Sequence, residues 1–428
     1  MGADTEVAMK ILITTDLYEP LINGVVSSIV NLRGELENLG HEVRVLTVSN
    51  DKTSHCENHV YYMSSLPLGF VYPNIRFPVK YGGTLIEEII RWNPDIVHSQ
   101  CEFFSFGLAQ KVVSHTHTPM VHTYHTLYEQ YMRYLLGGRI MPKGALPAFT
   151  RKRLRHVSAI IAPTKKVMRT LRSYGVTNPV TVIPTGIDLS VFYRSADKKV
   201  QQELRDRLKI PAHHKIILNL GRLGFEKNLS ELLYYFKDFL RIQPDVTFLI
   251  VGGGPAKESL QQLAAELQIS DHVVFTGMVL PGQVPDYYQL GDVFVCASTS
   301  ETQGLTYIEA AASGLPLVCR ADSCLEGVLE HGKNGFIYTD RKNFCRYVSA
   351  ALYTEKWRKI ASGRSRQISL LYGREQFGLN MESLYIKILK EKAVKNHESF
   401  DIFQTLGDSE AERRRQSNAN AGRIAYEK

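Results

Sequence analysis

The sequence lacks the features of membrane-spanning, disulfide-stapled and metal-binding proteins. In its 428 residues no apolar run approaches the roughly 18 residues that a membrane-spanning helix needs. A charged-then-apolar leader is also missing, so we expect a cytoplasmic protein. The six cysteines are scattered without a C-x-x-C pair, and no D-x-D triplet is present to hold a divalent metal. We therefore expect neither a metal nor another tightly bound cofactor.

Two common nucleotide-binding motifs are missing as well. No G-x-G-x-x-G fingerprint follows the first apolar run, which argues against a dinucleotide and hence against a dehydrogenase, an alternative that an NAD titration would test. The glycine run at Gly252–Pro255 is not followed by G-K-[S/T], so it is not a P-loop. We interpret this run as a structural turn.

Acidic residues are missing from one long stretch. Between Gln130 and Arg172 there are 11 Lys and Arg residues and no Asp or Glu, in a chain of net charge +8. Aromatic and aliphatic side chains lie among these cations, which suits a segment on an anionic lipid surface. No nucleic-acid-binding motif accompanies the stretch, so we expect no nucleic-acid partner. A solvated helix face and a non-catalytic polyanion-binding protein remain alternatives. The predicted membrane or acceptor cations are Arg139, Lys143, Arg151, Lys152, Arg153 and Arg155.

What is present is a twice-repeated alternation of strands and helices. Residues 9–14 form a continuous apolar run, typical of a parallel strand covered on both faces, and a helical pattern and a second strand at 42–48 follow it. The pattern begins again at 215–220. The chain therefore belongs to the α/β class with two domains, and we place the boundary near Ser190.

The most informative stretch is Ser298–Pro316. It follows the buried strand pattern 293–296, and its helix begins at Gly304. The unpaired N–H groups of Gly304, Leu305 and Thr306 predict an anion site at the helix start. Glu301 precedes the helix and Glu309 lies within it, and a carboxylate can accept from both hydroxyls of a ribose. A nucleoside diphosphate sugar satisfies all three features, with its ribose near Glu309 and its hexose near Glu301. The alternative is a helix cap with a surface glutamate.

Other polar residues also follow apolar runs. Arg222 and Lys227 lie after the strand at 215–220, where a guanidinium can grip phosphate oxygens and an ammonium acts as a point charge. His122 and His125 lie at the end of another strand, and we expect His122 to be structural. Gly24, in the loop after the first strand, would permit close backbone approach.

These motifs together resemble the retaining glycosyltransferases of family 4, which have the GT-B fold. The segment S-E-T-Q-G-L-T-Y-I-E-A resembles the branch that glycosylates diacylglycerol, because Gln303 replaces the aromatic residue usual in the wider family, as it does in glycolipid synthases. One mild departure is Asn23-Gly24, where many relatives have two glycines. The resemblance covers about residues 9–392. It is carried by the Gly24 loop, His125, the turn Pro184–Asp188, the pair Arg222 and Lys227, and the E-x7-E pair Glu301 and Glu309.

The resemblance implies an architecture. We expect two facing Rossmann-like domains with parallel sheets: an acceptor and membrane-facing domain at 1–190 and a nucleotide-sugar domain at 191–372. A C-terminal helix at about 373–392 would cross back and complete the first domain, with Phe377, Met381, Leu384 and Ile388 as its buried stripe. We expect the polar tail 393–428 to be disordered.

The resemblance also implies an activity, the transfer of a hexose, glucose from UDP-glucose, to a diacylglycerol hydroxyl with retention of the α configuration. His125 would bond the donor sugar and help define the acceptor pocket. Arg222 and Lys227 would neutralise the diphosphate, and the Gly24 loop would lie near donor phosphate and acceptor. The expected partners are a UDP-sugar, diacylglycerol and an anionic membrane surface, with the protein peripheral on the inner face. The alternative is the same fold acting on a soluble or polysaccharide acceptor.

Overall fold

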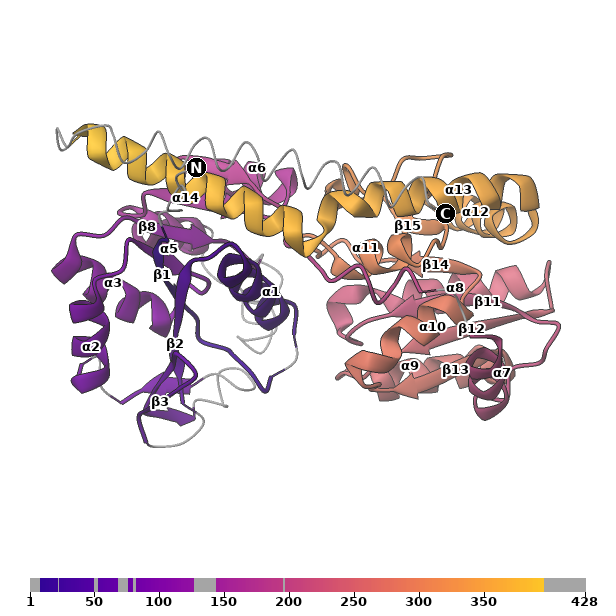
Figure 1. Cartoon of the computed structure of the whole chain (residues 1–428). Coiled ribbons are helices and arrows are strands. Elements are labelled where there is room, and N and C mark those ends of the chain that lie inside the picture. Colours follow the sequence, from indigo (N-terminus) through magenta and orange to yellow (C-terminus); the bar gives the residue numbers. More distant parts are fainter. Residues whose placement is uncertain are drawn as a thin grey trace, which may run out of the picture. The chain divides into compact units, whose positions relative to one another are not determined.

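The computed structural model describes residues 8–21, 23–49, 53–67, 76–79, 82–126, 144–194 and 197–395. These residues form two compact units (Figure 1): unit 1 comprises those up to Ile187 and from Arg374 onward, and unit 2 runs from Asp188 to Gly373. Each unit is built on a mainly parallel sheet, which confirms the predicted α/β class. Arg139, Lys143 and the tail from residue 396 lie outside the described residues, so the predictions made for them stay predictions.

The sheet of unit 1 has the strand order β10-β9-β8-β7-β1-β2-β4-β3. Its central strand β1 pairs in parallel with both β2 and β7, and Ile11, Leu12 and Ile13 are fully buried. This burial on both faces explains the continuous apolar run in the sequence. The strands are β1 Lys10–Thr14, β2 Glu42–Val48, β3 His55–Glu57, β4 Val60–Met63, β7 Ile96–Ser99, β8 Met120–Thr123, β9 Ala159–Ala162 and β10 Val180–Val182, with a separate hairpin of β5 Ser65–Pro67 and β6 Arg76–Pro78.

The last helix of unit 1, α14 (yellow in Figure 1), completes its core. The predicted stripe of Phe377, Met381, Leu384 and Ile388 is buried, as the heptad-like spacing requires. Gly378 makes the packing close, because a Cβ there would lie 2.7 Å from Cβ of Glu35 on α1. The helices of this unit are α1 Gly24–Asn38, α2 Thr84–Trp92, α3 Phe104–Thr116, α5 Ala145–Leu154, α6 Lys165–Ser173 and α14 Arg374–Lys395.

The sheet of unit 2 has the order β13-β12-β11-β14-β15-β16 and is parallel throughout. Cys296 and Cys319 are buried in adjacent strands, where they serve as small core residues. Its strands are β11 Lys215–Leu220, β12 Val246–Val251, β13 Val273–Gly277, β14 Val293–Cys296, β15 Leu317–Arg320 and β16 Gly335–Tyr338. Its helices are α7 Lys198–Arg207, α8 Leu229–Leu240, α9 Lys257–Glu266, α10 Val284–Leu290, α11 Leu305–Ala312, α12 Arg341–Tyr353 and α13 Glu355–Ser369, with 3₁₀ turns η1 Phe225–Lys227, η2 Ser270–His272, η3 Pro281–Gln283, η4 Ser323–Leu325 and η5 Leu370–Tyr372.

Strand order locates the ligand-binding edge of each unit. From β11 the chain proceeds outward through β12 and β13, and it then returns to place β14 on the other side of β11. Such a reversal is a topological switch point, and open parallel sheets bind ligands at the carboxyl ends of the strands beside it. The corresponding switch in unit 1 lies between β1 and β7. Among the described helices, none combines the length and apolar composition that crossing a membrane requires.

Candidate active site

The loops that leave β11 and β14 meet at the switch point of unit 2. Lys227 Nζ donates to Glu301 Oε1 over 2.6 Å, although the two residues are 74 positions apart in the sequence. Ser300 Oγ also donates to the carbonyl of Glu226 at 3.2 Å, which ties the same two loops together. The structure therefore brings together Lys227 and Glu301, two residues that the family resemblance assigns to one site. The pair is partly exposed, with 23% and 17% of the side chains accessible, so a ligand can reach it.

Arg222 lies in the same loop and is held by a residue that the sequence analysis did not single out. Its guanidinium pairs with the carboxylate of Glu226, which is largely buried beneath it. Arg222 itself is 43% exposed. Glu226 thus positions the guanidinium while leaving much of it open to solvent.

Glycines let the loop after β12 pack directly on the loop after β11. Gly252 and Gly254 have φ angles of 131° and 152°, in the region that favours glycine. A Cβ on Gly252 would lie 1.9 Å from the Gly221 carbonyl oxygen, and one on Gly254 would lie 2.5 Å from that of Leu223. The interpretation of this glycine run as a structural turn is confirmed. Met278, beyond β13, lies against Gly253 and is 82% exposed.

The helix α11 begins beside these loops. Gly304 adopts φ 72°, and the first bond of the turn runs from the Tyr307 N–H to the Gly304 carbonyl over 3.0 Å. This arrangement leaves the N–H groups of Leu305 and Thr306 to be satisfied from outside the helix. A Cβ on Gly221 would lie 3.8 Å from Thr306 Cγ2, so the chain preceding Arg222 passes against the helix start. Backbone donors and the cationic loop therefore lie together.

Glu309 lies one turn further along α11 and is held by a buried tyrosine. Tyr288 Oη donates to Glu309 Oε2 over 2.7 Å, which fixes the carboxylate and leaves Oε1 for a ligand. Burial raises the pKa of Glu309, while the bond from Tyr288 opposes the shift. A carboxylate that is held and partly desolvated in this way suits recognition of a diol by hydrogen bonds.

In unit 1, His125 follows β8 and belongs to a buried polar network. Its Nε2 is 2.7 Å from Gln100 Oε1, and Gln100 Nε2 is 3.2 Å from His98 Nε2. His98 in turn contacts Thr123 Oγ1 at 2.7 Å and Tyr385 Oη of α14 at 2.6 Å. Burial, followed by the nearby His122, lowers the pKa of His125 to about 3. His125 is therefore neutral at physiological pH and acts as a hydrogen-bonding group rather than a cation.

His122 has the structural role that the sequence predicted. It is fully buried, with Nδ1 3.3 Å from Ser99 Oγ and Nε2 3.3 Å from Glu102 Oε1. Both ring nitrogens are thus used inside the unit. Only His125, the partly exposed member of the pair, can meet a substrate.

The comparisons with known proteins agree with this geometry. Residues 22–191 match the model described as Glycosyltransferase Family 4, and residues 200–367 match Glycosyl transferases group 1. The chain is 32% identical to an alpha-monoglucosyldiacylglycerol synthase of Streptococcus pneumoniae, over 93% of this chain and 91% of that protein. It is 31% identical to the synthase of the same name from Acholeplasma laidlawii, over 89% and 98%. The chain belongs to this glycosyltransferase family.

Solved structures establish the GT-B fold of the glycosyltransferase. Anabaena HepE in complex with UDP-glucose superimposes with a TM-score of 0.68 at 17% identity, covering 88% of this chain and 99% of that one. A sucrose-phosphate synthase from Thermosynechococcus elongatus gives the same TM-score at 20% identity, over 88% and 98%. At these identities the likeness concerns the fold alone.

Asp16 is a residue of the glycosyltransferase that sequence reasoning missed. It follows β1 at the switch point of unit 1, and its Oδ1 accepts from the Ser105 N–H over 2.6 Å. No partner for Oδ2 exists among the described residues. Burial raises the pKa of Asp16 from 3.8 to about 6, against the hydrogen bonds from Ser105. The one sequence feature that could have identified Asp16 is its place just after the carboxyl end of β1, where open parallel sheets bind ligands.

We expect Asp16→Asn to stabilise the folded protein at neutral pH. A raised folded pKa means that the acid form contributes stability below pH 3.8, and that this stability is lost as the pH rises to about 6. Asn cannot ionise and keeps an oxygen for Ser105, so the free energy of unfolding should rise by about 1–3 kcal/mol above pH 6. Denaturant melts at pH 4 and pH 7.5 measure this, and an equal effect at both pH values would contradict the assignment.

The first loop of the glycosyltransferase differs from the sequence expectation. Gly24 is the first residue of α1 and its φ is not positive, so the position does not need a glycine for its backbone angle. Asn23 caps the helix, because its Oδ1 accepts from the N–H groups of Val25 and Val26 at 3.0 Å each. Those two donors are therefore not available to a phosphate. The predicted role of Gly24 in close backbone approach receives no support from its conformation.

The cations of α5 and the residues after it divide into two groups. Arg153 donates from Nε to the Glu102 carbonyl at 2.7 Å and lies 4.6 Å from the centre of the Phe106 ring. Arg153 thus serves the packing of unit 1, and we remove it from the membrane-facing set. Arg151, Lys152 and Arg155 are exposed and line an open cavity of about 450 Å³. The remaining lining residues are Ala148, Gly175, Val176, Thr177 and Asn178.

Three supporting residues, Glu226, Tyr288 and Gln100, were not predicted as part of the site. Glu226 directly precedes Lys227 and lies four positions after Arg222. Its place between these two cations could have indicated that it belongs to the site. Gln100 directly follows β7, which pairs with β8, the strand that precedes His125. Because open parallel sheets bind ligands at the carboxyl ends of their strands, this position could have identified Gln100 from the sequence. Tyr288 lies on α10, 21 positions before Glu309, and no local pattern points to that contact.

Proposed function

We propose that the protein transfers glucose from UDP-glucose to the hydroxyl of diacylglycerol and retains the α configuration. The observation that carries the proposal is the contact of Lys227 with Glu301 at the switch point of unit 2, beside the start of α11. Two relatives that align over most of this chain are alpha-monoglucosyldiacylglycerol synthases, which supports the acceptor and the sugar. HepE, a structure of the same fold, was solved with UDP-glucose, which supports the donor.

Unit 2 binds the donor in this proposal. Arg222 and Lys227 take the diphosphate together with the N–H groups of Leu305 and Thr306, Glu309 accepts from the ribose, and Glu301 accepts from hexose hydroxyls. The exposed Met278 and Leu280 beyond β13 cover the base. Without donor, both cations rest on carboxylates, Lys227 on Glu301 and Arg222 on Glu226. On donor binding, the two cations therefore exchange carboxylate partners for the diphosphate, so each has an anionic partner in both states.

The chemical step follows from these roles. The bond between the anomeric carbon and the phosphate oxygen breaks, and the acceptor oxygen bonds to the same face of that carbon. The acceptor proton passes to the departing phosphate oxygen, so no enzyme carboxylate is needed as nucleophile. Arg222, Lys227 and the helix-start N–H groups stabilise the negative charge that develops on UDP. Because cations supply this stabilisation, we propose that the step requires no divalent metal.

Unit 1 takes the acceptor and meets the membrane. Neutral His125, fixed by Gln100, offers a hydrogen bond to a sugar or acceptor hydroxyl. Arg151, Lys152 and Arg155 around their open cavity form the cationic face that we propose lies on anionic lipid headgroups. Each such cation contributes about 1 kcal/mol near an anionic surface, so the attachment is peripheral and reversible. We place the enzyme on the inner, cytoplasmic face, where UDP-glucose would be supplied.

Product analysis tests the activity. The purified chain is given UDP-glucose, and in parallel UDP-galactose and GDP-mannose, with vesicles of diacylglycerol in phosphatidylglycerol, and the glycolipid is analysed by NMR. We expect α-glucosyldiacylglycerol from UDP-glucose, formed equally with and without EDTA. A β-linked product would refute retention. Glucosylation of soluble sugars without any lipid product would favour the alternative acceptor, and a donor other than UDP-glucose would correct the sugar.

We expect Lys152→Ala/Arg155→Ala to weaken binding to phosphatidylglycerol vesicles by about 10- to 30-fold, since two cations at about 1 kcal/mol each are removed. Vesicle flotation measures this partition. The matched control is Lys342→Ala/Lys356→Ala, which removes the same charge from exposed positions of unit 2. If both double variants bind alike, or the parent does not bind, then this face is not the membrane contact and a soluble acceptor gains support.

A further inference from the structure

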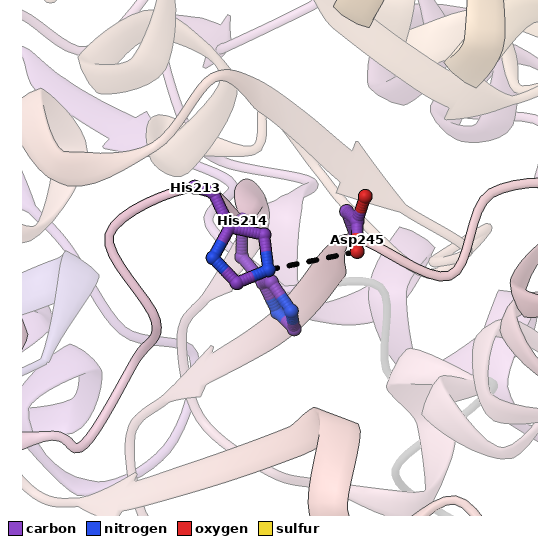
Figure 2. A group of neighbouring side chains, drawn as sticks. All are labelled: His213, His214 and Asp245. Atoms are coloured by element: carbon purple, nitrogen blue, oxygen red, sulfur yellow. Dashed lines mark ion pairs between the residues drawn. The ribbon is translucent and has the colours of Figure 1, made fainter.

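A group of potential metal ligands lies at the amino-terminal ends of the unit 2 strands, opposite the carboxyl ends where the candidate active site is found. His213 and His214 precede β11 and Asp245 precedes β12. One ligand atom from each of the three residues lies within 4.8 Å of the other two, and His213 Nε2 is 3.6 Å from Asp245 Oδ1. Figure 2 shows the His213 ring and the Asp245 carboxylate facing one another, with the His214 ring beside them. Neither the motifs nor the proposed function accounts for this group.

The backbone holds these residues in place. The Lys215 N–H donates to the Asp245 carbonyl over 3.0 Å, and the parallel register pairs Lys215 with Val246. The segment before β11 is fixed by Arg205, which donates to the carbonyls of Pro211 at 2.5 Å and His214 at 3.2 Å. The spacing of His214 from Asp245 is therefore set by the sheet rather than by a mobile loop.

The environment of His214 is that of a metal-binding imidazole. Its Nδ1 is 3.0 Å from Thr247 Oγ1, which leaves Nε2 for a ligand. Metal-bound histidines commonly have the other ring nitrogen bonded in this way. The parallel ring of His272, 5.7 Å away between centres, lies against His214.

We propose that His213, His214 and Asp245 form a binding site for a divalent transition metal, with Zn²⁺ as the best match. Two imidazoles and one carboxylate, completed by water, are a ligand set that tetrahedral zinc accepts. Ligand atoms around tetrahedral zinc lie about 2.0–2.2 Å from the ion and therefore about 3.3–3.6 Å from one another. The His213–Asp245 pair is already 3.6 Å apart, and the other separations, at most 4.8 Å, must shorten by no more than about 1.5 Å. His213 and Asp245 can make this adjustment, because both side chains are 68% exposed.

The position of the site indicates what the ion does. The six residues of β11 separate His214 from Gly221, and at about 3.3 Å per residue this places the ion about 20 Å from the Arg222 loop. Zinc there would join the segment before β11 to the turn before β12. It would thereby cross-link the amino-terminal ends of these two neighbouring strands. The ion would stabilise unit 2 and take no part in glycosyl transfer.

Zinc titration of the chelator-treated, untagged full chain tests the proposal. Calorimetry should give one site with a micromolar or tighter Kd. Saturating zinc should raise Tm by about 5 °C, because the ion binds the folded state only. His213→Ala and Asp245→Asn should each weaken binding by about 10- to 100-fold. Both residues are exposed, so these variants should fold. Co²⁺ in place of zinc should give the visible spectrum of a tetrahedral site.

The matched control is His115→Ala, an exposed histidine of unit 1, which should bind zinc like the parent. Glucosyl transfer by His213→Ala should equal that of the parent, with and without zinc, so failure of this site would not bear on the proposed activity. Absence of zinc binding by the parent overturns the proposal. Equal binding by the parent, His213→Ala and Asp245→Asn also overturns it, and the pair is then an ordinary surface ion pair.

Discussion

Replacing Lys227 by alanine is expected to lower kcat for glucosyl transfer by about 10³-fold, with a smaller change in KM for UDP-glucose. In the proposed mechanism the ammonium faces the position where negative charge develops as UDP leaves, and a charge that grows in the transition state affects kcat more than binding. In the folded protein Lys227 Nζ is 2.6 Å from Glu301 Oε1 at the switch point. Steady-state kinetics with diacylglycerol vesicles measure both constants.

The Lys227→Ala experiment needs a control, because the variant leaves the Glu301 carboxylate without its positive partner and that charge could itself repel the diphosphate. Lys227→Ala/Glu301→Gln, compared with Glu301→Gln alone, therefore separates the loss of the cation from repulsion of the diphosphate. We expect the double variant to recover Tm but not kcat. Lys342→Ala, at an exposed position of α12, should retain full activity. If Lys227→Ala kept kcat within a few-fold of the parent, Lys227 would not stabilise the leaving group.

The convergence of Lys227 and Glu301 could be predicted because it follows from the sheet alone. Parallel strands buried on both faces leave continuous apolar runs in the sequence, and β11 and β14 were located from such runs. Once two strands flank a switch point, residues after their carboxyl ends must be neighbours. The strands β3, β4, β5 and β6 were missed. Each has only three or four residues, and runs this short are hard to tell from loops or helix segments by their apolar pattern alone.

The contacts that hold the functional groups could not be predicted in the same way. Tyr288 reaches Glu309 from another helix, and Tyr385 reaches His98 across 287 positions of the sequence. Such contacts depend on how helices pack over the sheet, which periodicity does not encode. The basic run 151–155 was also ambiguous, because the sequence does not show which of its cations face solvent. Arg151 and Arg153 are the same residue type two positions apart, and yet Arg153 lies over the Phe106 ring inside unit 1. Only the packing distinguishes a surface cation from a structural one.

Glu309→Ala is expected to raise KM for UDP-glucose by about 10- to 100-fold while changing kcat much less. A carboxylate that accepts from both ribose hydroxyls contributes about 1.5–3 kcal/mol, and this contact is the same in ground and transition states. Tyr288 Oη holds Glu309 Oε2 at 2.7 Å, so the acceptor is oriented before the donor arrives. Initial rates over a range of UDP-glucose concentrations measure the change, and the inhibition constant of UDP should rise in parallel.

A donor without the ribose 2′-hydroxyl separates direct recognition from altered packing around α11. The parent enzyme should bind the 2′-deoxy analogue of UDP-glucose about tenfold more weakly than UDP-glucose, whereas Glu309→Ala should scarcely distinguish the two. Tyr288→Phe keeps the carboxylate but removes its orienting bond, so it should retain the preference at reduced strength. If Glu309→Ala discriminated between the donors as strongly as the parent, the carboxylate would not contact that hydroxyl. The loss of affinity would then come from Tyr288, whose buried hydroxyl would keep only its longer, 3.4 Å bond to the Thr306 carbonyl at the start of α11.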